Sequence, residues 1–371
     1  MTASNQSKAL QSLKKNIGQL LMMGLESTQL NPQEKQTLEQ CNIGGVIYFK
    51  RNIENPDQIR SLSDQIYRHT QDLPLIAIDQ EGGIVTRLHE PFTVFPGNSY
   101  LGNCYKNNKN AQLAASQAQA MAKELKAVGI NLNFTPVVDV HSNPKNPVIG
   151  PRAFDSDPKN VSTLAKITIA QYKKEKVICC AKHFPGHGDT DLDSHFDLPT
   201  ITATKKVLWD RELVPFRASI ATAVPTIMTA HIMFPALDKK YPATLSKKIL
   251  EGLLRQELGY KGVIISDDLE MKAIAKHMPI SEAAVMAFAA GVDLALVCKS
   301  LGELQASFEA LIKAAEKGKL TQERLSQALR RVRSLKRRYL NRMAFEKLKR
   351  PTKYAWATHK RLAEKIKSLG A

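Results

Sequence analysis

Short apolar runs recur along the chain, and stretches long enough for a helix separate them. The seven runs are Gly45–Phe49, Leu75–Ile78, Phe134–Val138, Val177–Ala181, Thr226–Ala230, Val263–Ile265 and Leu294–Val297. Each run is nearly continuous in apolar residues, which is typical of strands in a parallel sheet buried on both faces. Amphipathic segments such as 111–128 and 281–290, each followed by a glycine, fit between the runs as helices. The pattern predicts repeated βα units.

Polar and ionisable residues follow five of the seven runs. These residues are Asp79; Asp139 and His141; Lys182 and His183; His231; and Ser266, Asp267 and Asp268. In a barrel the carboxyl ends of all strands meet at one mouth, where active sites are built. A doubly wound sheet would place a glycine-rich phosphate turn after its first strand, and Arg51-Asn52 is no such turn. We therefore expect an α/β fold, a single TIM-like (β/α)8 barrel in which one strand is short, irregular or missing.

The N-terminal segment Ile17–Leu25 follows two lysines and only faintly resembles a signal peptide. Gly18 and Gln19 interrupt its apolar part, and no small-residue cleavage site follows promptly. We expect it to form the first helix of the fold. No apolar run approaches the ~20 residues that a bilayer requires, so no membrane span is expected. Five cysteines without a CxxC pair argue against a disulfide framework and a structural zinc site, and favour a cytoplasmic location.

The net charge of +18 is concentrated near the C-terminus. Residues 330–371 hold fifteen Lys and Arg against two acids, a local charge of +13, which leaves +5 for the rest. Apolar positions spaced three and four apart predict a helix packed on the barrel at Leu325, Ala328, Val332, Leu335 and Tyr339. We expect a barrel domain over 1–343 and a basic, partly helical extension over 344–371. The extension is either a solvated face or a weak adhesion surface for RNA, anionic lipid or an acidic partner.

Two segments, 182–195 and 264–271, hold the residues best suited to chemistry. The first is rich in Gly, Pro and polar residues after His183, as expected of a loop at the mouth. In it, Asp193 lies two residues from His195, close enough to orient the imidazole and favour its protonated form. That would make the imidazole a usable acid near neutral pH. Asp267, at the tip of an apolar strand, is placed as a carboxylate nucleophile or base.

Less specific interpretations compete with each motif. An Asp-x-His pair on a loop is more often a turn contact than a catalytic dyad, and Ser266-Asp267-Asp268 also fits a helix N-cap. A metal site is a third possibility, but Gly and Pro between the histidines make the spacing unfavourable. The residues of that potential ligand set are His183, His187, Asp189, Asp193 and His195.

The first segment, Lys182-His183-Phe184-Pro185-Gly186-His187-Gly188 with Asp193-Ser194-His195, resembles family-3 glycoside hydrolases of the NagZ type, which are bacterial β-N-acetylglucosaminidases. Four further stretches match the same family, in the same order. They are residues 17–20 with 44–47, 78–83, 133–140 and 266–269. Together the matches extend from about residue 15 to about residue 340.

The resemblance implies a retaining double displacement. Asp267 would be the nucleophile, and His195 paired with Asp193 would be the general acid/base in place of the usual carboxylic acid. The resemblance also implies a set of residues that bind the GlcNAc ring and its N-acetyl group, namely Asp79, Arg87, Arg152, Lys182 and His183. It implies no cofactor and no metal. Two departures from the family pattern flank the expected site: Ile84, where the family usually has Arg, and Glu270, where it often has Ser.

The expected function is that of an exo-β-N-acetylglucosaminidase in peptidoglycan recycling. Its substrates would be muropeptide fragments, GlcNAc-1,6-anhydroMurNAc peptides, cleaved by a cytoplasmic monomer with no specific nucleic-acid partner. Within the same family, a β-N-acetylglucosaminide phosphorylase and a β-glucosidase are alternatives. Outside enzymes, the alternative is a basic nucleic-acid-binding protein on an inactive barrel.

Overall fold

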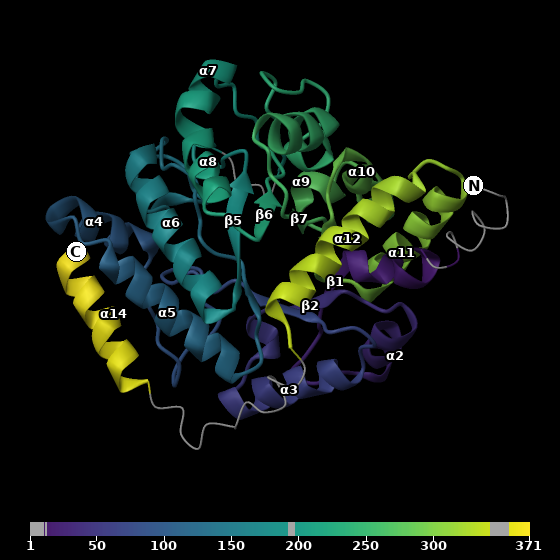
Figure 1. Cartoon of the computed structure of the whole chain (residues 1–371), viewed down its shortest axis with the longest axis horizontal. Coiled ribbons are helices and arrows are strands. Elements are labelled where there is room, and N and C mark those ends of the chain that lie inside the picture. The colour runs from purple at the N-terminus through teal and green to yellow at the C-terminus, as the bar shows by residue number, and fades with distance from the viewer. Residues whose placement is uncertain (1–10, 12, 192–196, 342–355) are drawn as a thin grey trace.

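The computed structural model describes residues 11, 13–191, 197–341 and 356–371. Eight parallel strands form one closed barrel in sequence order, and β1 pairs with β8 to complete it (Figure 1). The expected (β/α)8 barrel is therefore confirmed. The strands are β1 (Leu21–Gly24), β2 (Gly45–Tyr48), β3 (Leu75–Ile78), β4 (Leu132–Asn133), β5 (Ile178–Phe184), β6 (Thr226–Thr229), β7 (Val263–Asp268) and β8 (Leu294–Val297).

The strand without an apolar run of its own in the sequence pattern is β1. It lies inside the segment expected to be the first helix, so that expectation was wrong. Only Ile17–Leu20 form a short 3-10 turn, and the backbone becomes extended at Leu21. Met22 then pairs with Gly45 of β2 and with Leu296 of β8. Periodicity does not separate a buried strand from a buried helix in so short an apolar run.

The fourth strand is short and begins earlier than expected. It occupies Leu132–Asn133 instead of Phe134–Val138. Pro136 has no N–H to donate to a ladder, which is one reason why regular pairing does not continue through this run. Val137 forms only an isolated bridge with Lys182 of β5.

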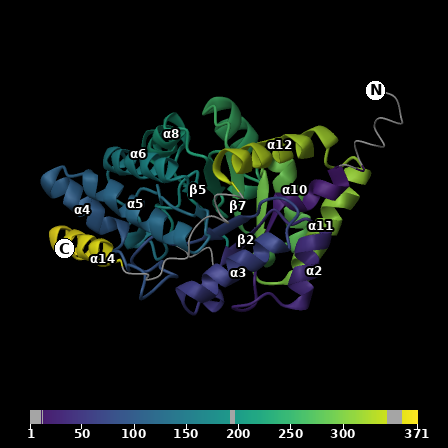
Figure 2. The same cartoon turned by 60° about the horizontal axis from the view of Figure 1, so that its bottom comes forward.

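Helices surround the barrel on the outside (Figures 1 and 2). Those expected over 111–128 and 281–290 are confirmed, and Gly129 and Gly291 follow them with positive φ values of 87° and 129°. Among the described residues, no helix has both the length and the apolar character to span a membrane. The longer helices up to α11 are α2 (Pro32–Gln40), α3 (Pro56–Arg68), α4 (Asn98–Asn108), α5 (Gln112–Ala127), α6 (Pro158–Glu175), α8 (Leu213–Ala221), α10 (Ile280–Ala290) and α11 (Leu301–Glu316).

Helix α12 (Gln322–Tyr339) packs on the barrel through the apolar stripe that the sequence predicts. Leu325, Ala328, Val332 and Leu335 are buried on it. Lys336 is buried beside them, and its Nζ donates to Gln19 Oε1 at 2.6 Å. Helix α12 thereby contacts the 3-10 turn that leads into β1.

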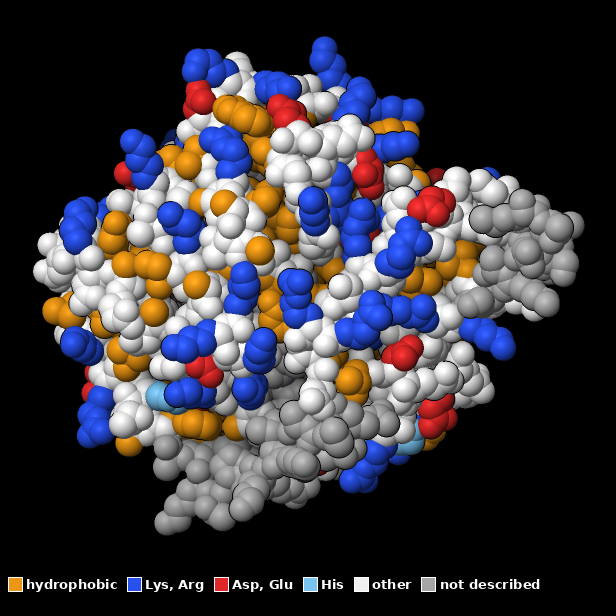
Figure 3. Space-filling model, viewed as in Figure 1, with side chains coloured by type: hydrophobic (Ala, Val, Ile, Leu, Met, Phe, Trp, Pro, Cys, Tyr) orange, Lys and Arg blue, Asp and Glu red, His pale blue; other side chains and the backbone are white. Residues whose placement is uncertain are grey.

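The last helix, α14 (Ala357–Gly370), docks on α4 and α5 at the edge of the molecule (Figures 1 and 2). Its buried residues Ala363, Ile366 and Gly370 follow the three- and four-residue spacing of one helix face. The described part of the basic extension is therefore half docked and half solvated. On the face seen in Figure 3, Lys and Arg clearly outnumber Asp and Glu, as the net charge requires.

Candidate functional site

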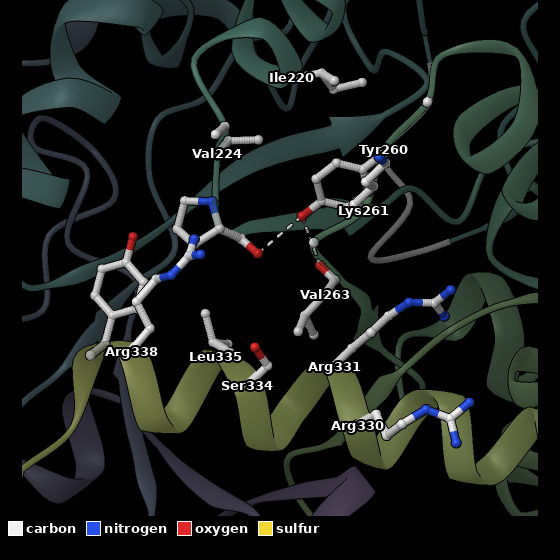
Figure 4. Close-up of a pocket in the computed structure, with 15 residues that line it drawn as sticks. Ile220, Val224, Tyr260, Lys261, Val263, Arg330, Arg331, Ser334, Leu335 and Arg338 are labelled. Carbon is white, nitrogen blue, oxygen red and sulfur yellow. Dashed lines mark hydrogen bonds between the residues drawn. The ribbon is translucent and has the colours of Figure 1, made fainter.

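A cavity of about 450 Å³ lies between α12 and the turns that precede β6 and β7, at the amino end of the barrel strands. Figure 4 shows Ser334 and Leu335 pointing into it from α12, while Arg330 and Arg331 extend along one side. Among the described residues that line it, none is Asp, Glu, His or Cys. The groups able to act as nucleophile, acid or base gather instead at the carboxyl ends of the strands, where we place the candidate site.

A buried network of charges joins the ends of β3 and β5. Lys182 of β5 lies with its Nζ 2.7 Å from Asp79 Oδ1 and 2.7 Å from Glu81 Oε1. Arg152, on a 3-10 turn over Gly150–Arg152, makes a two-pronged contact with the Glu81 carboxylate at 2.8 and 2.9 Å. Burial alone would raise the pKa of Glu81, but Arg152 and Lys182 hold it well below its usual range. The two cations are thus held in fixed positions by the carboxylates of Asp79 and Glu81.

A second network fixes the histidine of β5. Asp139, fully buried, accepts from the His183 ring at Nδ1 (2.8 Å) and from the backbone N–H groups of His183 and His187. Burial raises the pKa of Asp139, but the two histidines outweigh it and lower the pKa below its ordinary value. The opposite ring atom, His183 Nε2, lies 3.5 Å from Arg152. His183 therefore has a fixed orientation at the edge of the first network.

Asp267 lies near the end of β7 and is partly exposed. Burial acts to raise its pKa, but His231, His183 and the N–H of Asp268 lower it below the ordinary value, with Lys182 adding to the effect. Its Oδ1 accepts from the Asp268 N–H at 2.8 Å. Within the described part of the chain, no side chain is recorded as donating a hydrogen bond to it. Asp267 is thus an ionised carboxylate whose oxygens remain accessible to a substrate.

The residues around Asp267 hold the strand end in place. Ser266 Oγ accepts from Leu296 N of β8, and Asp268 Oδ1 accepts from the N–H groups of Glu270 and Cys298. The next helix, α9 (Lys272–Ala275), begins after Met271. The N-cap interpretation of 266–268 is therefore wrong, because these residues belong to a strand. Glu270 supports the neighbouring loop by accepting from Lys299 N and Ser300 N.

The loop after β3 carries Arg87 to the same region. Arg87 NH2 lies 3.9 Å from Asp79 Oδ2, and the Gln80 side chain accepts from the N–H of Arg87 at 2.8 Å. In the same loop, the side chain of Ile84 is 69% exposed to solvent. Ile84, one of the two departures from the family pattern, is therefore a surface residue of this loop and not a core residue.

The structure brings most of the predicted site residues together. Asp79, Arg87, Arg152, Lys182 and His183 are linked by ion pairs and hydrogen bonds, and His183 and Lys182 act electrostatically on Asp267. The predicted dyad of Asp193 and His195 lies in 192–196, outside the described residues. Sequence reasoning missed Glu81 and gave no role to Asp139 or His231. Asp139 and His231 directly follow apolar runs, so the rule that selected Asp79 applied to them as well.

Glu212 lies behind the loop that follows β5 and has no obvious sequence signal. It ends a π-helical turn, Leu208–Glu212, and leaves no room for a side chain at Gly186 of that loop, where an added Cβ would lie 2.8 Å from the Cβ of Glu212. Arg211 links it to the loop, since its Nε donates to Glu212 and its NH2 contacts Asp189. Burial raises the pKa of Glu212 to about 7 despite Arg211.

The arrangement suits binding and covalent chemistry on a neutral polar ligand. Among the described residues, no group of three His, Cys, Asp or Glu side chains is arranged to hold a metal ion. The fixed donors Lys182, Arg152 and His183 are placed to recognise hydroxyl and amide oxygens, and Asp267 is placed to attack or stabilise a cationic centre.

Comparison with known proteins identifies relatives that are glycoside hydrolases. The family described as "Glycosyl hydrolase family 3 N terminal domain" matches residues 12–335. A β-hexosaminidase from Alkalilimnicola ehrlichii is 41% identical over 280 residues, which cover 75% of this chain and 80% of that protein. Beta-hexosaminidase A from Pseudoalteromonas piscicida is 39% identical over 333 residues, covering 83% of this chain. The chain spans only 56% of the length of that second relative.

Two solved structures are similar in both sequence and fold. A glycoside hydrolase family 3 β-N-acetylglucosaminidase from Paenibacillus sp. str. FPU-7 is 39% identical with a TM-score of 0.91, covering 96% of this chain and 68% of that one. NagZ from Neisseria gonorrhoeae, in complex with N-trifluoroacetyl-D-glucosamine, is 31% identical with a TM-score of 0.77. That likeness covers 95% of this chain and 98% of the other.

Proposed function

The chain belongs to glycosyl hydrolase family 3, among glycoside hydrolases of the β-hexosaminidase type, and from this premise we propose that it is a retaining exo-β-N-acetylglucosaminidase. Its substrates would be glycosides with a terminal non-reducing β-GlcNAc. The observation that carries the proposal is Asp267, an ionised, accessible carboxylate beside a ring of fixed hydrogen-bond donors.

In the proposed first step, Asp267 attacks the anomeric carbon as the glycosidic bond breaks. A covalent glycosyl ester forms, and the leaving oxygen takes a proton from His195, which Asp193 orients. In the second step, water attacks the same carbon, gives its proton to His195 and releases Asp267. Two displacements at one carbon retain the anomeric configuration. The low pKa of Asp267 suits this role, because only the ionised carboxylate is nucleophilic.

The sugar ring would be held by the charge network at β3 and β5. Lys182 and Arg152 are each anchored by a carboxylate, so they keep their positions when a ligand arrives. Asp79 and Arg87 would accept from and donate to ring hydroxyls, and His183 is oriented by Asp139. Neutral sugars are recognised by such fixed donors and acceptors, which lose binding energy when a hydroxyl is missing or misplaced.

For the natural substrate we propose GlcNAc-1,6-anhydroMurNAc peptides in peptidoglycan recycling, with a cytoplasmic location. The support is the resemblance to the NagZ type and the similarity to the Neisseria NagZ, which was solved with an N-acylated glucosamine.

The test is release of nitrophenol from nitrophenyl β-GlcNAc, with the β-glucoside and β-GalNAc in parallel. Wild type should prefer β-GlcNAc, and Asp267→Ala should lose the activity. Glu309→Ala, which removes an exposed carboxylate on α11, is the matched control and should behave as wild type. The assay is repeated with inorganic phosphate: formation of GlcNAc-1-phosphate would replace hydrolysis with phosphorolysis. An inactive wild type would refute the proposal.

A further inference from the structure

Helix α14 contacts the outer side of the loop that supplies the candidate site. This loop, residues 79–97, connects β3 with α4 and carries Asp79, Glu81 and Arg87. A cavity of about 470 Å³ lies between the two, lined by Val94 and Phe95 from the loop and by Ala363 and Lys367 from the helix. The basic extension therefore lies against the outer surface of a functional loop.

The apolar side of α14 fits closely on α4. A Cβ built on Gly370 would lie 2.3 Å from the carbonyl oxygen of Tyr100, so only glycine allows the helices to approach this closely. Asn103 Nδ2 donates to the Gly370 carbonyl at 2.9 Å, and the Cys104 thiol donates to the Ile366 carbonyl at 3.6 Å. These contacts fix the position and register of α14.

A polar relay then runs from α14 to the loop. His359 Nδ1 lies 2.8 Å from Glu124 Oε1 of α5, and the other carboxylate oxygen, Oε2, accepts from the N–H of Thr93 at 2.8 Å. The side chain of Glu124 is only 5% exposed, so it depends on these two partners. A second contact, Lys360 to Glu90 at 2.5 Å, is exposed and is expected to contribute little.

The loop carries the relay inward by its own hydrogen bonds. Two residues after Thr93, the carbonyl of Phe95 accepts from Gly83 N at 2.9 Å. Glu81, two residues before Gly83, donates its N–H to Val85 and holds Lys182 and Arg152 with its carboxylate. A contiguous path of hydrogen bonds and short backbone segments thus joins His359 to the residues proposed to hold the sugar.

We propose that α14 is a positioning element for the 79–97 loop, acting through His359 and Glu124, and that it sets how tightly the site binds the sugar. This proposal rests on the proposed function for its kinetic consequence, but its structural part does not. His359 touches no reacting group, so it is a positioning residue and not a catalytic one. Loss of the relay should loosen the loop and raise KM, while the kcat set by Asp267 stays nearly constant.

The experiment compares three variants in the full chain. His359→Ala removes the donor, His359→Asn keeps an amide N–H close to the position of Nδ1, and Lys365→Ala is the control. Lys365 is exposed on the same helix, with no side-chain partner recorded in the described residues. Hydrogen–deuterium exchange of the 79–97 peptides is measured together with KM and kcat on nitrophenyl β-GlcNAc.

The expected result is faster exchange of the loop peptides in His359→Ala and a KM raised roughly 3- to 10-fold, the size expected from the net contribution of one typical hydrogen bond. His359→Asn should recover most of both effects, and Lys365→Ala should show neither. Faster exchange confined to α14, or a fall in kcat at constant KM, would overturn the proposal. An inactive wild type would refute the hydrolase function, while the exchange data would still decide whether α14 positions the loop.

Discussion

Both ends of the barrel bury charge, but they use it differently. At the amino end of the strands, the fully buried Asp293 contacts three guanidinium groups, those of Arg255, Arg324 and Arg331, at 2.5, 3.0 and 3.0 Å. It also accepts from the N–H of Ile264 in β7. At the carboxyl end, Glu81 and Asp139 are also held by several donors, but Asp267 has no side-chain donor among the described residues.

The difference between Asp293 and Asp267 separates a carboxylate that stabilises the fold from one that is available to a ligand. At the amino end, the carboxylate joins β7 to α12 and to the π-helical segment Lys248–Glu257, and its hydrogen-bonding capacity is used within the protein. At the mouth, the paired groups serve to hold cations in place around one carboxylate that remains accessible. An ionised group in a charged network marks a candidate active site when its neighbours leave it with hydrogen-bonding capacity to spare, because a substrate can then use that capacity.

The comparison predicts the largest effect at the mouth. Asp267→Ala should lower kcat/KM on the aryl glycoside by at least about a thousandfold, since it removes the proposed nucleophile. Its free energy of unfolding should fall only slightly, because the Asp268 N–H is the one donor that loses its hydrogen-bond acceptor. Kinetic assays measure the loss of activity, and thermal or urea unfolding measures the change in stability. A strongly destabilised Asp267→Ala would show that this carboxylate is structural as well.

At the amino end we expect the opposite result, a large loss of stability with little change in kcat. Asp293→Asn leaves Arg255, Arg324 and Arg331 without their shared carboxylate, and breaking such a buried network costs about 3–5 kcal/mol. Urea unfolding measures the loss. The kcat of the fraction that remains folded should lie within about twofold of wild type. A fall in kcat comparable to that of Asp267→Ala would remove the distinction between the two ends.

Lys336 gives a pH-dependent test of the amino end. Burial lowers its pKa to about 7 from the ordinary 10.5, so the unfolded chain binds more protons between these values. The stability of wild type should therefore rise with pH across this window, relative to Lys336→Met, which does not titrate. Unfolding free energies at pH 6.5 and pH 9.5 for both proteins supply the comparison. If the unfolding free energies of the two proteins changed equally with pH, the pKa of Lys336 would not be lowered in the folded protein.

The smallest effect is expected for Glu212, which lies at the mouth of the barrel. Its pKa is raised to about 7 by burial, with Asp139 and Asp189 adding to the effect against Arg211, so the folded protein binds the extra proton. Wild type should lose stability relative to Glu212→Gln as the pH rises from about 4.5 to about 7, and the difference should then level off. Unfolding at pH 5 and pH 8 measures it. A difference that does not change with pH would contradict the raised pKa.

The sequence predicted the barrel because burial on both faces leaves a strong signal in continuous apolar runs. The same signal was ambiguous at Leu21–Gly24, where a strand and a helix turn are equally apolar, and it misplaced β4 next to Pro136. Asp79, Lys182 and His183 could be selected because they directly follow apolar runs, although Lys182 and His183 lie inside β5. Arg152 was selected only by resemblance, since its partner Glu81 lies far away in the sequence. The dyad of Asp193 and His195 stays a prediction.

The pairing of β1 with β8, which closes the barrel, also determines when the sheet can be completed during synthesis. Leu21 of β1 pairs with Ala295 of β8, so the first strand is made long before its second neighbour exists. At roughly 5–20 residues per second, the sheet carries an open edge for tens of seconds. An apolar parallel edge of this kind invites pairing with other chains. The nascent chain therefore passes through its most aggregation-prone period before β8 is available, and expression at lower temperature or with chaperones should improve the yield of folded protein.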